Sequence, residues 1–150
     1  LLVAAAAAST LVSGCAWLER QQGTPLHPVV TLINGEIDIQ PPVLRYRRSE
    51  GPVTITWRLA PRDGVRLADP AVVLEDPRRS KLAVDAGLRQ DCPNGYDSPV
   101  GVFSCGPGER AHEYVCKNAN ARPGCYKYTM RLMVDGKLVE KDPPIINFMD

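Results

Sequence analysis

The chain has 150 residues, of which 44% are hydrophobic and 23% are charged. These values are typical of a single globular domain and argue against a disordered or fibrous chain. The formal net charge is only +1, from 18 basic and 17 acidic side chains, so no overall field favours nucleic acid as a partner. Fourteen prolines and twelve glycines, with only 6% aromatic residues, favour short β-strands joined by turns over helices.

Residues 1–14 are uncharged, almost wholly apolar or small, and run directly into Cys15. A helix of this length is too short to cross the roughly 30 Å hydrocarbon core of a membrane, but it suits the apolar region of a secretory signal peptide. The sequence begins at Leu1 with neither a methionine nor a basic region, so we expect this signal peptide to be N-terminally incomplete.

The segment Leu11-Val12-Ser13-Gly14-Cys15 resembles the lipobox of bacterial lipoproteins, in which an aliphatic residue and two small residues precede a cysteine. The resemblance implies lipid transfer to the Cys15 sulfur, cleavage between Gly14 and Cys15, and acylation of the new amino group. Two or three acyl chains make release from a membrane negligible. In this family an aspartate after the cysteine retains the protein in the inner membrane. Ala16 stands there, so we expect the periplasmic face of the outer membrane.

The remainder of the chain divides into a tether and a domain. Residues 15–27 comprise the lipidated cysteine and a stretch without a repeating apolar pattern, which is typical of a linker. Residues 28–150 are long enough to bury a core, and we expect them to form one domain.

Strict alternation of apolar and polar residues dominates this domain. It is clearest in Val53–Leu59 and in Tyr126–Val134, and it predicts strands with one buried and one exposed face. Asp135-Gly136 then supplies the two residues of a tight hairpin turn. The return strand is Lys137–Glu140, and Ile145–Phe148 follows a proline break. Further short strands are expected at Val29–Ile33, Glu36–Ile39, Val43–Tyr46, Val65–Leu67, Ala71–Leu74, Val100–Ser104 and Tyr114–Cys116.

Seven to nine short strands without helices or an internal repeat predict an all-β fold, an antiparallel two-sheet sandwich of immunoglobulin-like kind. A small closed β-barrel is the second choice. The chain also resembles a group of uncharacterised bacterial β-sandwich domains, and this resemblance implies the fold but no activity. It rests on Asn34–Ile37, Ile55–Leu59, Phe103-x-Cys105, Tyr114-x-Cys116-x-Asn118-x-Asn120, Tyr126–Thr129, Asp142-Pro143 and Asn147.

Four cysteines remain after Cys15, and an even number in an exported domain predicts two disulfides. The segments around Cys105 and Cys116 look like facing strands, which favours Cys105–Cys116 nested within Cys92–Cys125. Pairing of neighbours, Cys92–Cys105 with Cys116–Cys125, is the alternative. The spacing of these cysteines does not fit a metal site, and we expect neither a metal nor a cofactor.

No catalytic motif is present, so we expect the protein not to be an enzyme. Ser104, His112 and Glu113 could in principle form a catalytic triad, but the position of His112 is more typical of an exposed loop. Asp91–Asp97 carries oxygen ligands around a turn glycine, yet its spacing does not match a calcium-binding loop and favours a turn.

Arg45, Arg47 and Arg48 form one basic cluster, and residues 78, 79 and 81 form another. Arg45 and Arg47 would share a strand face and could bind anionic headgroups, a glycan or an acidic partner. A solvated face is the favoured interpretation, because nearby acidic residues neutralise the total charge. The leading hypothesis is a membrane-anchored envelope lipoprotein that acts without catalysis as a binding or structural module, with an envelope protein or glycan as its partner. The alternatives are an inhibitor of lysozyme or another hydrolase, and a hydrolase with an unrecognised site.

Overall fold

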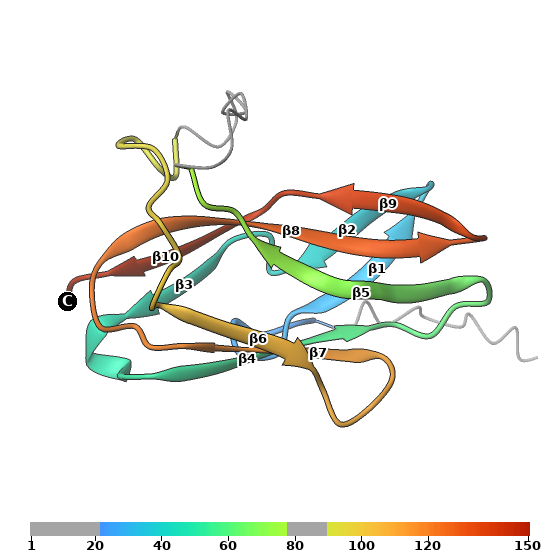
Figure 1. Cartoon of the computed structure of the whole chain (residues 1–150), viewed down its shortest axis with the longest axis horizontal. Helices are drawn as coiled ribbons and strands as arrows, with labels where there is room; N and C mark the ends of the chain where they lie inside the picture. Colours follow the sequence, from blue (N-terminus) through green and yellow to red (C-terminus); the bar gives the residue numbers. More distant parts are fainter. Residues whose placement is uncertain (1–21, 78–89) are drawn as a thin grey trace, which may run out of the picture.

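A computed structural model describes residues 22–77 and 90–150. These residues form ten strands and one short 3₁₀ turn, η1 (Figure 1). The strands are β1 (Val29–Ile33), β2 (Glu36–Gln40), β3 (Leu44–Arg47), β4 (Val53–Leu59), β5 (Val65–Leu74), β6 (Phe103–Pro107), β7 (Glu113–Asn118), β8 (Gly124–Val134), β9 (Lys137–Lys141) and β10 (Pro144–Phe148), and η1 spans Arg48–Glu50.

The strands form two sheets that are not closed into a barrel. The first has the order β2-β1-β4-β7-β6, and the second has the order β3-β10-β8-β5, with β9 also paired to β8. Each sheet contains one parallel pair, β1 with β4 and β3 with β10, so the sheets are mixed rather than purely antiparallel. The predicted all-β two-sheet sandwich is therefore confirmed, and the barrel alternative is wrong.

The core lies between the two sheets because alternate side chains of every central strand point inward. Trp57 from β4 and Tyr128 from β8 meet at its centre, where the indole Nε1 donates to the tyrosine hydroxyl at 3.2 Å. Their rings lie 5.2 Å apart at a tilted angle. The two long alternating segments seen in the sequence thus supply the largest side chains of the core.

The two largest differences from the predicted strands are at β5 and β6, and the other strand boundaries agree within two residues. The predicted strands 65–67 and 71–74 are one strand, β5, whose register against β8 shifts between Leu67 and Val72. Pro70 lies in this shift, where a residue without an N–H cannot donate a hydrogen bond to the ladder. The strand predicted at 100–104 begins three residues later, at Phe103, because Gly101 adopts a positive φ of 74° in the preceding turn.

The hairpin predicted at Asp135-Gly136 is present, and Asn34-Gly35 also forms a tight hairpin, between β1 and β2. Asn34-Gly35 and Asp135-Gly136 have positive φ at both positions, which is the backbone of a type I′ turn. Figure 1 places the β8–β9 turn and the β1–β2 turn toward one end of the sandwich, with the β3–β4 connection and the C-terminus at the other.

The hydrogen-bonded part of the domain begins before residue 28. Leu26 and Pro28 accept backbone bonds from Thr56 and Arg58 of β4, and the Tyr46 hydroxyl donates to the Pro25 carbonyl. The segment from Pro25 onward is thus held against the sandwich. No helix in the described part of the chain is long and apolar enough to cross a membrane.

Candidate binding surface

The arginine cluster lies on β3, at the open edge of the second sheet. Leu44 and Tyr46 are buried in the core, whereas Arg45 and Arg47 are exposed on the outer face. This alternation is the one expected for a strand with a single buried face, and it places the two arginines side by side as predicted. Arg48 follows directly at the start of η1.

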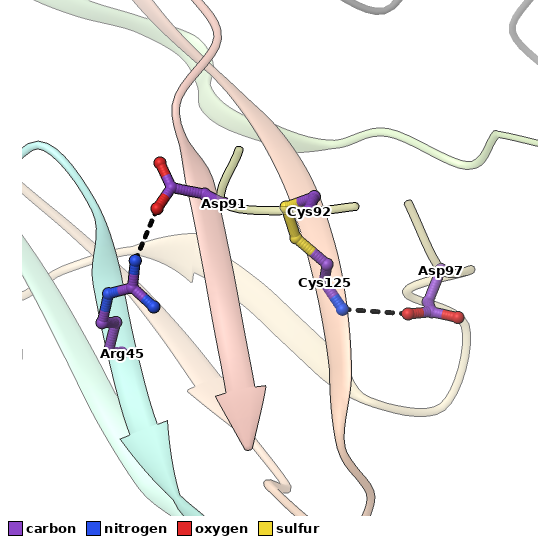
Figure 2. The surroundings of a disulfide bond; sticks show 5 residues. All are labelled: Arg45, Asp91, Cys92, Asp97 and Cys125. Carbon is purple, nitrogen blue, oxygen red and sulfur yellow. Dashed lines mark hydrogen bonds and ion pairs between the residues drawn. A yellow bond between two sulfur atoms is a disulfide. The ribbon is translucent and has the colours of Figure 1, made fainter. Parts of the chain in front are cut away.

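Arg45 is tied to a distant segment of the chain. Its Nη2 lies 2.5 Å from the Asp91 Oδ1, and the two side chains are 51% and 31% exposed (Figure 2). An exposed pair of this kind contributes about 1 kcal/mol or less to folding. Its main effect is to orient Asp91 across the outer face of β3.

A disulfide holds this segment in place. Cys92 is bonded to Cys125 of β8, and both residues are nearly buried, at 3% and 9% exposed. Around the bridge a second, small apolar cluster forms outside the main core. Its other members are Ile146 and the partly buried Val43, Tyr96 and Phe148.

Asp97 fixes the same segment at a second point. Its Oδ2 accepts the Cys125 N–H at 2.9 Å, and its own N–H donates to the Cys125 carbonyl at 2.7 Å (Figure 2). Since Asp91 pairs with Arg45, the two aspartates of the calcium-like segment are engaged in separate contacts. The Gly95 N–H donates to the Cys92 carbonyl at 3.0 Å, so the predicted turn is present in this segment.

Aromatic and sulfur groups border the other two arginines. The Arg47 guanidinium carbon lies 6.0 Å from the centre of the Phe148 ring, at the outer range of a cation–π contact. The Arg48 Nη1 lies 3.8 Å from the Met149 sulfur. We call this outer surface the β3 face, defined by Arg45, Arg47, Arg48, Asp91, Tyr96, Ile146 and Phe148.

Charges on the β3 face are largely balanced. Asp91 faces Arg45, Glu50 accepts the Arg47 backbone N–H at 2.6 Å, and Asp150 accepts the Ser49 hydroxyl at 2.6 Å. Alternating charges of this kind give directional contacts instead of a broad positive field.

A buried asparagine network holds the end of β3 in position. Asn118 of β7 and Asn147 of β10 exchange side-chain amide bonds of 2.7 and 3.0 Å, linking the two sheets. Asn120 donates to the carbonyls of Arg47 and Gly51 at 2.6 and 3.0 Å, which fixes the connection that carries Arg48. Sequence reasoning assigned these asparagines no role. The alternation through Tyr114, Cys116 and Asn118 was the signal that Asn118 points inward.

The disulfide pairing is the one that the sequence favoured. Cys92 pairs with Cys125 and Cys105 pairs with Cys116, and the latter two lie directly opposite each other on β6 and β7. The neighbour pairing is therefore wrong.

The structure does not bring Ser104, His112 and Glu113 together as a catalytic triad. Ser104 lies opposite Lys117 in the ladder, and His112 precedes β7. Since a strand rises about 3.3 Å per residue and His112 is five positions from Lys117, His112 lies roughly 16 Å along the hairpin from Ser104. Glu113 instead lies 3.4 Å from the Arg58 Nε. Within residues 22–77 and 90–150, no group of three or more His, Cys, Asp or Glu side chains could hold a metal ion.

Gly14, Cys15 and the second basic cluster at residues 78, 79 and 81 lie outside the described residues. Comparison with protein-family models and with curated proteins found no match to this chain.

Proposed function

We propose that this protein is a lipid-anchored envelope lipoprotein whose sandwich binds an envelope protein or glycan through the β3 face, without catalysis. The observation that carries the proposal is that the Arg45–Asp91 pair and the Arg47–Phe148 contact lie on one exposed surface, with the buried Cys92–Cys125 bridge directly beside Asp91. The lipobox around Cys15 supports the anchor.

The composition of the β3 face suits recognition. Arginine and aromatic side chains are enriched at protein interfaces because they offer large contact areas together with directional donors. The disulfide and the Asp97 bonds restrict the segment from Asp91 to Asp97 before a partner binds. Less conformational freedom is then lost on binding, which favours affinity.

The partner is expected to carry acidic groups. Among the described residues, neither Arg47 nor Arg48 forms an ion pair, so their guanidinium donors remain available to carboxylates. The balanced charges of the surrounding surface favour a partner with matched, directional groups over nucleic acid or a uniformly anionic membrane. Acidic side chains of an envelope protein or the carboxylates of a glycan fit this description.

Crosslinking in intact bacterial cells, followed by immunoprecipitation of the full-length protein, tests the proposal. We expect Arg47→Glu/Arg48→Glu to reduce the crosslinked species by roughly tenfold or more, because acidic partners are then repelled. The matched control is Arg66→Glu/Lys137→Glu, which changes the net charge equally at exposed positions of β5 and β9.

The control should retain the wild-type amount of crosslinked species. Equal recovery from the Arg47→Glu/Arg48→Glu variant and the wild type, with both folded by circular dichroism, would show that the β3 face is not the binding surface. Recovery of no crosslinked species from the wild type would refute a binding role.

A further inference from the structure

The two disulfides differ sharply in their exposure. Cys92 and Cys125 are 3% and 9% exposed, and Cys116 is fully buried. Cys105 is exposed, because it lies on β6, the outermost strand of the first sheet. The Cys105–Cys116 bridge therefore offers one sulfur-bearing residue to solvent, whereas the Cys92–Cys125 bridge lies within a small apolar cluster.

Cys105 lines an open groove between the two sheets. The groove has a volume of about 270 Å³ and lies between β5 and β6. Figure 1 shows these two strands on the same side of the sandwich. The groove is lined by Val72, Leu74, Pro99, Val100, Phe103 and Cys105.

This groove gives an incoming thiol access to the bridge. Its size exceeds that of a small thiol side chain, and none of its lining residues carries a carboxylate that would repel a thiolate. Val100 at its wall is 64% exposed, so the entrance is open to solvent on that side.

We propose that Cys105 is a site of thiol–disulfide exchange. The thiolate of a thiol-bearing molecule attacks the Cys105 Sγ from the groove. A new sulfur–sulfur bond forms there while the Cys105–Cys116 bond breaks, and Cys116 leaves as a thiolate that takes a proton from solvent. A second thiol can then attack the mixed disulfide and release Cys105, so that the incoming pair is oxidised and the bridge is reduced.

The exchange has a defined structural consequence. Without the bridge, β6 remains attached through its backbone ladder to β7 and through Phe103, whose ring lies 5.0 Å from that of Tyr126 in an edge arrangement. The bridge closes a loop of 11 residues, and its loss is expected to loosen this edge hairpin before the rest of the sandwich. This inference does not depend on the proposed binding function.

The test exposes the full-length oxidised protein, in detergent, to millimolar reduced glutathione. The reaction is quenched with acid, free thiols are alkylated, and the modified cysteines are located by peptide mass spectrometry. We expect the glutathione adduct on Cys105. The free thiol of Cys116 should appear roughly tenfold faster than a free thiol of Cys92 or Cys125, because the exposed partner Cys105 is attacked first. A parallel arm with a thioredoxin-type dithiol protein distinguishes a small thiol from a protein thiol as the reactant.

Val100→Trp tests access through the groove, since the larger side chain would occupy it. The rate at Cys105 should fall several-fold, whereas Leu138→Trp, a change at a comparably exposed apolar residue on β9, should leave the rate unchanged. An adduct on Cys116, equal rates at both bridges, earlier reduction of Cys92–Cys125, or an unchanged rate in Val100→Trp would each overturn the proposal.

Discussion

Among individual residues, the buried asparagines have the clearest energetic role. Asn147→Ala would remove both of its amide bonds with Asn118 and leave buried polar atoms without those partners. We expect a loss of about 2–3 kcal/mol in the free energy of unfolding, measured by urea denaturation. Asn94→Ala, in an exposed turn, is the matched control and should change stability by less than about 0.5 kcal/mol. Equal effects of the two substitutions would contradict an inter-sheet role for Asn147.

Gly23 is required by the close approach of the N-terminal segment to β2. A Cβ at this position would lie 1.8 Å from the Gln40 carbonyl oxygen and 2.6 Å from the Val29 nitrogen, both of which are backbone atoms. Gly23→Ala should therefore displace the segment and cost about 1–3 kcal/mol in thermal or urea unfolding. Gly106→Ala has no atom within 4 Å of the new Cβ and should be neutral or slightly stabilising. A neutral Gly23→Ala would show that the segment does not pack there.

The core tyrosines predict how stability depends on pH. Burial raises the pKa of Tyr46 and of Tyr128 well above the usual value near 10, although the Trp57 hydrogen bond partly offsets this effect at Tyr128. Because the folded state favours the protonated phenols, their contribution is fully present below the unfolded pKa near 10. It then decreases by up to about 1.4 kcal/mol per pH unit for each tyrosine as the pH rises.

Absorbance at 295 nm during alkaline titration measures this effect. The Tyr46 and Tyr128 phenols should ionise only together with unfolding, at a pH above the usual tyrosine pKa near 10. Ionisation of all five tyrosines near pH 10 with the fold intact would contradict the burial of these two groups.

Among the elements, the segment from Asp91 to Asp97 depends most on covalent attachment. The Cys92–Cys125 bridge closes 33 residues and should contribute about 4 kcal/mol, against about 3 kcal/mol for the 11-residue loop of Cys105–Cys116. Cys92→Ala/Cys125→Ala should therefore lower stability and also weaken partner crosslinking, because Asp91 is no longer held beside Arg45. Cys105→Ala/Cys116→Ala should lower stability alone. If the folded Cys92→Ala/Cys125→Ala variant were crosslinked as fully as the wild type, the segment from Asp91 to Asp97 would not be part of the binding surface.

Local patterns in the sequence predicted most strands, because alternation and turn residues act over a few positions. They placed Val53–Leu59 and the Asp135-Gly136 hairpin correctly. They failed where tertiary pairing decides the outcome. β5 continues through Pro70 because β8 pairs on both sides of the register shift, and the parallel pairs join strands that lie far apart in the chain.

The same distinction applies to the candidate site. Alternation predicted that Arg45 and Arg47 share a face, which depends only on their spacing. It could not identify Asp91 or Phe148 as their neighbours, since these residues are 46 and 101 positions away along the chain and reach β3 through a disulfide and a parallel strand. The face on which a strand residue lies depends on its local sequence, whereas its neighbours on that surface depend on how distant segments of the chain pack together.

At the scale of the whole molecule, the proposed role requires the sandwich to be held at a membrane. Cys15 is the residue on which this depends, because lipid on its sulfur and amino group would retain the domain in the envelope. Cys15→Ser should leave the fold unchanged but release the protein from the membrane fraction, since the substituted residue lies before the segment that packs on β4. Retention of this variant at the membrane would contradict the anchor.

The most direct test is the intact mass and N-terminal peptide of the protein purified from bacterial membranes. Our account predicts a mature chain that begins at Cys15 and carries a diacylglyceryl group on the sulfur and an acyl chain on the amino group. An unmodified Cys15, or a mature N-terminus at another residue, would contradict the account.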